Sequence, residues 1–318
     1  MTKRKIRTYA EVGHDTGSAI LEQVQAQGAR LARRLAGVDR LIVIASGKGG
    51  VGKSLVAANL AAALSRRGLA VGAADADLNG PSLGRMLGVA GASLTVTDDG
   101  VEPVAGAAGV RVMSMDLLLA SEEAPLRWRE PEMGGFAWQS TLETGALREF
   151  LSDTAWGALD ALVVDLPPGT DKLQRMLRLV PDPSAVVLVT TPTEVSRFVV
   201  GKSVALARDA RVRRLGLVAN MAGHACEHCG RPTSLFDPAP AVRMAEESGV
   251  PLWAMVPFDP RAGASTDAGL PIVGADPESA AARALELLAD RVLEAGPAPG
   301  RARRGEAGAA PAERETTP

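Results

Sequence analysis

One short segment of the chain combines glycine, lysine and serine in a way that could hold a nucleotide. It reads Gly47-Lys48-Gly49-Gly50-Val51-Gly52-Lys53-Ser54. Its glycines let backbone N–H groups point inward at an anion, and a helix that starts directly after them adds its positive end. Lys53 would bridge the β- and γ-phosphates, and the Ser54 hydroxyl would bind Mg²⁺. The spacing therefore predicts that residues 47–54 bind ATP together with Mg²⁺.

A second lysine, Lys48, stands at the start of this loop, where an ordinary phosphate loop needs none. A lysine at this position resembles the deviant Walker A motif, whose members dimerise face to face and reach across to the partner's nucleotide. The resemblance implies that Lys48 and Lys53 both take part in catalysis, Lys53 on its own subunit's nucleotide and Lys48 on the partner's. The alternative is a solvated lysine at the edge of a loop.

Polar residues also follow several apolar runs that are typical of strands. The carboxyl ends of parallel strands form the ligand-binding edge of a sheet. We expect Asp165 to hold the metal, mostly through water, Asp75 to support the magnesium shell, and Asp77 to orient the attacking water. The alternative for Asp75 and Asp77 is the capping of a helix or turn. Asn220 and Pro257 could frame the adenine, although an asparagine at a strand end is often only a turn former.

The two cysteines, Cys226 and Cys229, lie in a segment predicted as a loop at 224–230. Two thiolates at this spacing can share a metal, but a tetrahedral site needs four ligands. The missing ligands are either His224 and His228, which suits zinc, or the same cysteines of a second copy. A two-fold dimer would bring four thiolates together, and four thiolates suit a [4Fe–4S] cluster. A redox-active dithiol fits less well, because the pair does not open a helix after a strand.

The elements that must position these groups alternate along the middle of the chain. Continuous apolar strands separated by helical patterns indicate a parallel sheet that is covered on both faces. The sequence therefore predicts a doubly wound, mainly parallel α/β fold of the P-loop NTPase kind. The predicted strands are 41–45, 70–74, 161–165, 184–190, 214–220 and 251–256, and a hairpin at 94–104 is expected to join the sheet.

The two ends of the chain differ in composition from this domain, which is expected to span 41–294. Residues 1–40 are polar, with apolar positions at helical spacing toward their end, and predict an arm whose short helix packs on the domain. Residues 295–318 consist mainly of Ala, Pro, Gly, Arg and Glu. With almost no apolar residue to bury, they predict a disordered tail.

Charge and hydropathy argue against several classes of protein. A net charge of −2 offers no bulk attraction to nucleic acid or to anionic lipid. No apolar run approaches the ~20 residues that span a bilayer. The basic residues near the N-terminus are not followed by the apolar segment of a secretory signal, and two cysteines cannot build a disulfide framework. We therefore expect a cytoplasmic protein that binds neither nucleic acid nor membranes.

Over roughly residues 41–273 the chain resembles the Mrp/ApbC family of iron–sulfur carrier ATPases, within the MinD- and ParA-like P-loop superfamily. The resemblance is carried by Ser46–Ser54, Asp75–Ser82, Trp128-Arg129, Trp156–Asp160, Asp165–Thr170, Asn220-Met221 and the Cys226/Cys229 pair. It implies a homodimer that carries a bridging [4Fe–4S] cluster and delivers it to apoproteins, with nucleotide binding controlling the transfer.

The chain departs from the pattern of that family in three places. Leu55 stands where a threonine usually follows the phosphate-loop serine, and Asp171 follows Thr170 without the intervening glycine. Residues 130–133 replace Gly-Pro-Met, and extra residues occur around 134–144. We expect these changes to affect the rate of ATP hydrolysis, which should be slow, and the choice of client more than nucleotide or cluster binding.

A positioning or regulatory ATPase of the MinD or ParA type is the rival interpretation, with a structural zinc at the cysteines. A MinD-type protein needs a membrane-seeking amphipathic helix near its C-terminus, and Arg301–Pro318 has no apolar face. A ParA-type protein needs a basic surface for DNA, which the net charge does not provide. Neither type explains Cys226 and Cys229, so the carrier is the preferred hypothesis.

Overall fold

The computed structural model describes residues 19–77, 80–118, 136–180, 182–226, 229, 231–233 and 239–294. Four features named above lie outside the described residues. They are the start of the N-terminal arm, the Trp128–Met133 segment, His228 and the predicted tail at 295–318.

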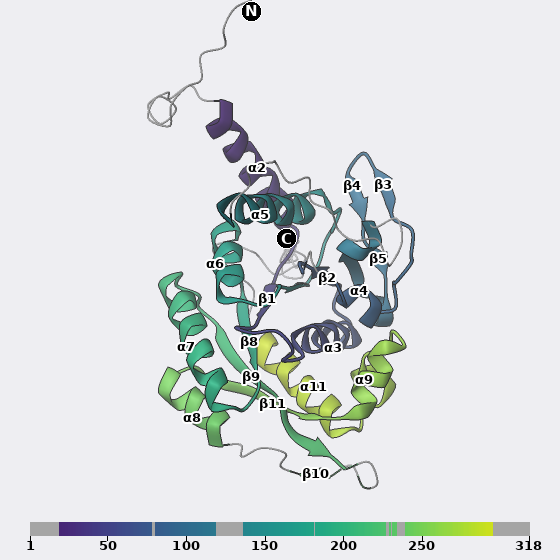
Figure 1. The fold of residues 1–318 in the computed structure, drawn as a ribbon. Helices are drawn as coiled ribbons and strands as arrows, with labels where there is room; N and C mark the ends of the chain where they lie inside the picture. The colour runs from purple at the N-terminus through teal and green to yellow at the C-terminus, as the bar shows by residue number, and fades with distance from the viewer. Residues whose placement is uncertain are drawn as a thin grey trace, which may run out of the picture.

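A nine-stranded sheet forms the centre of the fold, in the order β10-β9-β8-β1-β7-β2-β6-β5, with β11 also paired to β9 (Figure 1). Among the described strands of this sheet, all pairs are parallel except β9/β10 and β5/β6. The predicted mainly parallel sheet is confirmed, although the sequence analysis missed β6. The strands are β1 (Leu41–Ala45), β2 (Val71–Asp75), β5 (Val104–Ala105), β6 (Arg111–Ser114), β7 (Ala161–Asp165), β8 (Ala185–Thr190), β9 (Leu215–Ala225), β10 (Pro232–Thr233) and β11 (Leu252–Phe258).

Helices cover both faces of this sheet (Figure 1). The side chains of β1 show why, because all five are buried and alternate between two cores. Ile42 and Ile44 pack with α3, α10 and α11, whereas Leu41 and Val43 pack with α2, α5, α6 and α7. The doubly wound α/β class is therefore confirmed. The helices are α2 (Ala19–Leu35), α3 (Lys53–Arg66), α4 (Leu83–Met86), α5 (Phe136–Asp153), α6 (Thr170–Leu179), α7 (Glu194–Asp209), α8 (Ala239–Ser248), α9 (Pro260–Asp267), α10 (Ile272–Ala275) and α11 (Ala280–Leu293), with short 3₁₀ turns η1 (Ala107–Gly109) and η2 (Met115–Leu118).

The hairpin expected at 94–104 forms, but the expectation that it joins the central sheet is wrong. Strands β3 (Thr95–Thr97) and β4 (Gly100–Glu102) make a separate two-stranded sheet. Only the last residue of 94–104, Val104, joins the central sheet, as part of β5, which pairs with β6. Val96 of the separate hairpin is 76% exposed.

The part of the N-terminal arm that the structure describes continues into the core. Leu31 and Leu35 of α2 are buried against α5 and the sheet, and Val38 forms a parallel bridge with Leu159. The apolar spacing that predicted a packed helix therefore reflects real burial. Within the described residues, no helix combines the length and the apolar character that crossing a membrane would need.

Candidate functional site

The phosphate loop connects β1 to α3 at the carboxyl edge of the sheet. Gly50 and Gly52 have φ values of +74° and +76°, a left-handed conformation that glycine adopts without steric cost. Helix α3 begins at Lys53, and neither a side-chain cap nor an acidic residue occupies its first turn. The first backbone N–H groups of a helix have no partner within the helix. Here they stay available to an anion, so the cradle fits the phosphates of a nucleotide.

Asn220, in the middle of β9, contacts this loop directly. Its side-chain Nδ2 donates a hydrogen bond of 2.9 Å to the carbonyl oxygen of Val51. A Cβ atom at Gly52 would lie 2.2 Å from the same Nδ2, so the loop approaches Asn220 as closely as glycine permits. This contact was not expected from the sequence. The adenine roles of Asn220 and of Pro257, on the adjacent β11, stay predictions.

The lysine, serine and aspartate predicted for this site do come together. Lys53 Nζ lies 2.5 Å from Asp165 Oδ1 and 3.3 Å from Ser54 Oγ. Burial raises the pKa of the Asp165 carboxyl, while the charge and hydrogen bond of Lys53 and a hydrogen bond from Ser54 oppose the rise. The other oxygen, Asp165 Oδ2, is buried without a hydrogen-bond partner. A buried carboxylate oxygen with nothing to accept, next to a hydroxyl, fits the oxygen ligation that Mg²⁺ prefers.

Asp75 is fully buried, and it organises the loop that follows β2. Its carboxylate accepts hydrogen bonds from the backbone N–H groups of Asp77 (3.1 Å), Ser82 (2.8 Å) and Leu83 (2.8 Å) and from the hydroxyl of Ser114 (3.2 Å). Burial and then the charge of Asp165 raise its pKa to about 7, although the backbone donors oppose this. These bonds match the capping alternative. The role of Asp75 in a magnesium shell stays a prediction.

Asp77 and Lys48 lie on the more open side of the site. Asp77 is partly exposed, and its Oδ1 accepts a hydrogen bond of 3.1 Å from the backbone N–H of Gly80. Its charge contributes to the raised pKa of Asp165, so the two carboxylates interact. Lys48 is also partly exposed, and its carbonyl oxygen accepts a hydrogen bond of 3.0 Å from the Ser46 hydroxyl. Both side chains can therefore meet groups that arrive from outside the subunit.

Replacing Asp75 with asparagine should destabilise the protein more than replacing Asp77 with asparagine. An amide NH₂ would face N–H donors that now bond to a buried carboxylate, and an unsatisfied buried donor costs about 1–3 kcal/mol. Asp77 accepts one bond in a partly exposed loop, so its amide should be tolerated. Thermal unfolding of both variants tests this, and equal melting temperatures would contradict the structural role of Asp75.

The prediction that 224–230 is a loop is wrong at its beginning. Strand β9 continues through His224 and Ala225, which pair with β10 in an antiparallel hairpin. The backbone N–H of Cys226 then donates a hydrogen bond of 3.0 Å to the carbonyl oxygen of Arg231. The end of β9 is strand because it pairs with β10, which has only two residues. A strand this short has no sequence pattern that could be recognised, so the extension of β9 was missed. The first cysteine thus directly follows the strand that supports the phosphate loop.

Cys226 is partly exposed and Cys229 is exposed, and no disulfide joins them. Within the described residues, no group of three or more His, Cys, Asp or Glu side chains is arranged to hold a metal ion. His228, one of the two histidines considered as zinc ligands, lies outside those residues. Two accessible thiols at the end of a hairpin can meet ligands that another copy of the chain provides.

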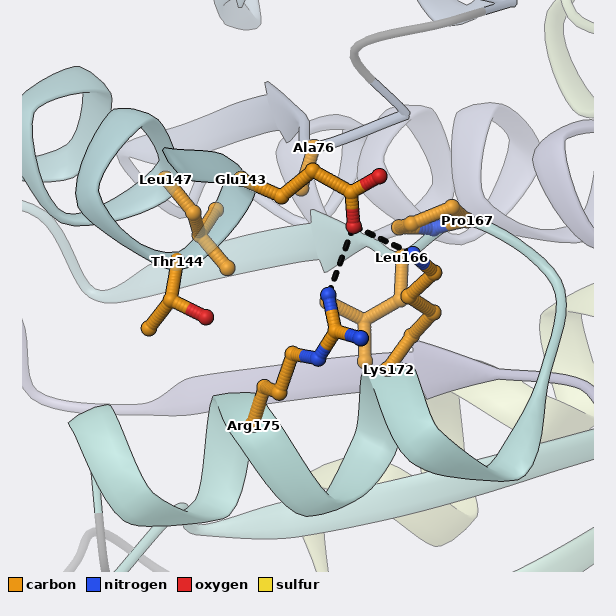
Figure 2. Close-up of a pocket in the computed structure, with 8 residues that line it drawn as sticks. All are labelled: Ala76, Glu143, Thr144, Leu147, Leu166, Pro167, Lys172 and Arg175. Carbon is orange, nitrogen blue, oxygen red and sulfur yellow. Dashed lines mark hydrogen bonds and ion pairs between the residues drawn. The ribbon is translucent and has the colours of Figure 1, made fainter. Parts of the chain in front are cut away.

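A pocket lies against the loops that follow β2 and β7 (Figure 2). Its lining residues are Ala76, Glu143, Thr144, Leu147, Leu166, Pro167, Lys172 and Arg175. The Glu143 carboxylate of α5 accepts hydrogen bonds from Lys172 Nζ (2.5 Å) and Arg175 Nη1 (2.6 Å) of α6. Burial would raise the pKa of Glu143, but these two cations outweigh it and lower the pKa. Arg175 also pairs with Asp171 at 3.0 Å. Glu143 therefore ties α5 to the start of α6, and Asp171 pairs with Arg175 within α6.

Comparison with known proteins gives a consistent result. Residues 37–293 match the family model described as ParA: NUBPL iron-transfer P-loop NTPase. The chain is 39% identical over 274 residues to the iron–sulfur cluster carrier protein of Saccharolobus solfataricus, covering 86% of this chain and 89% of that protein. It is 38% identical over 269 residues to the human cytosolic Fe-S cluster assembly factor NUBP2, covering 83% and 96%.

A solved structure shares both the fold and part of the sequence. It is the nucleotide-binding protein of Archaeoglobus fulgidus in complex with ADP, with a TM-score of 0.64 and 34% sequence identity. The match covers 76% of this chain and 91% of that chain.

Proposed function

The chain belongs to the Mrp/ApbC family of iron-transfer P-loop NTPases, and we propose that it is an ATP-dependent carrier of iron–sulfur clusters. A homodimer binds one [4Fe–4S] cluster between its subunits and passes it to apoproteins in the cytoplasm. The position of Cys226 and Cys229 carries this proposal, because both thiols are accessible on the hairpin beyond β9. Two cysteines per chain cannot complete a four-thiolate site, so the cluster needs a second copy.

ATP binds at the phosphate loop in this proposal. The first N–H groups of α3 and the Lys53 ammonium hold its phosphates, so Lys53 exchanges the Asp165 carboxylate for phosphate oxygens. Ser54 and Asp165 hold Mg²⁺, which supplies charge that stabilises the phosphoryl oxygens during transfer. Lys48 reaches the nucleotide of the partner. The support is the grouping of Lys53, Ser54 and Asp165 within hydrogen-bond distance.

Replacing Asp77 with alanine should lower ATP turnover by on the order of 10²-fold, because positioning and deprotonating the attacking water contributes at least that much. The protein should then accumulate with ATP bound. Steady-state phosphate release and the nucleotide content of the purified variant measure the two effects. Turnover at the wild-type rate would assign the water to another residue, with Asp75 as the first candidate.

The iron and sulfide content of protein reconstituted without oxygen tests the carrier itself. We expect about four iron atoms and four sulfides per two chains, because one cubane cluster needs the thiolates of both. The cluster content should rise with the fraction of dimer measured by light scattering. One zinc ion per chain in a colourless monomer would overturn the carrier and support a nucleotide switch with a structural zinc site.

A further inference from the structure

Strands β9 and β11 lose their regular register just before the cysteines. Val256 pairs with Asn220 and Phe258 pairs with His224, so β9 uses four residues where β11 uses two. Within this stretch Met221 has a φ of +58°, which is uncommon for a residue other than glycine. Bulges of this kind bend a strand and redirect its side chains, and they are frequent beside functional sites. The irregularity thus redirects the part of β9 that leads to the thiols.

The redirected segment meets β11 through two rings. His224 and Phe258 stack with their centroids 6.2 Å apart and their planes at 27°. This is the last register pair between β9 and β11, the two strands that run together to the start of the hairpin (Figure 1). The Phe258 side chain is 44% exposed and so is not part of the buried core, and its ring contacts that of His224.

Besides the pairing of β9 with β11, two hydrogen bonds lie within the hairpin. Thr233 Oγ1 donates to the carbonyl oxygen of His224 at 3.2 Å, and the Cys226 N–H donates to the Arg231 carbonyl. These bonds join β10 to β9 and hold the hairpin closed, but they do not fix its direction relative to the sheet. The backbone pairing of His224 with Phe258 and the contact between their two rings join the start of the hairpin to β11.

We infer that Phe258 is a positioning residue for the cysteine pair. Its ring holds the ring of His224, and this fixes the direction in which β9 presents Cys226 and Cys229. In this inference His224 acts through its ring and not through a ligating nitrogen. The inference rests on the proposed function, in which the two thiols bind a cluster together. Partners that orient metal ligands without touching the metal typically change metal affinity about 10- to 100-fold.

The metal-free protein tests this with phenylarsine oxide, a probe that two thiols bind only when they can reach it at once. Phe258→Ala should weaken its binding about tenfold or more, whereas Phe258→Tyr keeps a ring and should bind as tightly as wild type. Phe198→Ala is the matched control, because Phe198 on α7 is an exposed phenylalanine, at 69%, whose ring contacts Arg197 of the same helix. Unchanged binding in Phe258→Ala would overturn the inference.

A second pair of variants separates stacking from ligation and does not depend on the folding of Phe258→Ala. His224→Phe keeps a ring but removes both nitrogens, so it should bind the arsenical like wild type, and His224→Ala should bind it about tenfold more weakly. Equal weakening in both would overturn the role of the ring. In the reconstituted protein, Phe258→Ala should also lose iron to a chelator faster than wild type.

The two readouts keep this inference apart from the proposed function. Arsenical binding requires no iron, so it reports the placement of the thiols in either case. Wild-type protein that holds no cluster but shows the Phe258 effect would refute the carrier and support the positioning role. A cluster that forms and is retained equally in wild type and Phe258→Ala, with equal arsenical binding, would support the carrier and refute the positioning role.

Discussion

Replacing either Cys226 or Cys229 with alanine is expected to abolish cluster binding and to leave the affinity for ATP unchanged. Each variant would offer two thiolates per dimer in place of four, which cannot complete a cubane site. The contact of β9 with the phosphate loop is made by Asn220, which precedes both cysteines and is unchanged in these variants. Iron and sulfide analysis after anaerobic reconstitution measures the first effect, and calorimetric titration with ATP measures the second.

Two results would contradict this expectation. A single-cysteine variant that retains stoichiometric iron would show that other ligands complete the site. A variant that loses iron and ATP binding together would show that the hairpin and the loop form one unit, in which Asn220 transmits changes to Val51 through its hydrogen bond. Thermal unfolding of each variant serves as the control for folding.

Replacing Lys53 with alanine is expected to reduce ATP affinity by about 10²-fold or more. The substitution removes the charge next to the first turn of α3, and charge-assisted hydrogen bonds of this kind contribute about 1.5–3 kcal/mol each. It also leaves the Asp165 carboxylate, which is fully buried, without its cation. Losing one member of a buried ion pair costs about 3–5 kcal/mol of stability, so the melting temperature should fall as well.

Lys48→Ala is the matched comparison for Lys53→Ala. Lys48 is partly exposed and lies in the same loop, so its loss should spare most ATP binding and impair hydrolysis in the dimer. Titration with ATP and steady-state turnover of both variants separate the two lysines. Equal loss of ATP binding in both would argue against the assignment of Lys48 to the partner's nucleotide.

The sequence by itself determined the parts of the site that consecutive residues carry. The phosphate loop could be recognised because its glycines, Lys53 and Ser54 act through local backbone geometry and through the helix that follows. The bounds of β1 and β7 were also predicted as the structure has them. Both strands are buried on two faces and therefore consist of continuous apolar runs, which sequence patterns reveal.

Only the tertiary structure decided which distant residues meet. It placed Ser114 of the unpredicted β6 within hydrogen-bond distance of Asp75, and Asn220 within hydrogen-bond distance of the Val51 carbonyl. It paired Glu143 of α5 with Arg175 of α6. It also separated the hairpin β3–β4 from the central sheet and extended β9 to the first cysteine. These outcomes depend on which strands are neighbours and on a register shift between β9 and β11. Strand order and register arise from packing between segments far apart in the chain, so no local pattern of residues contains them.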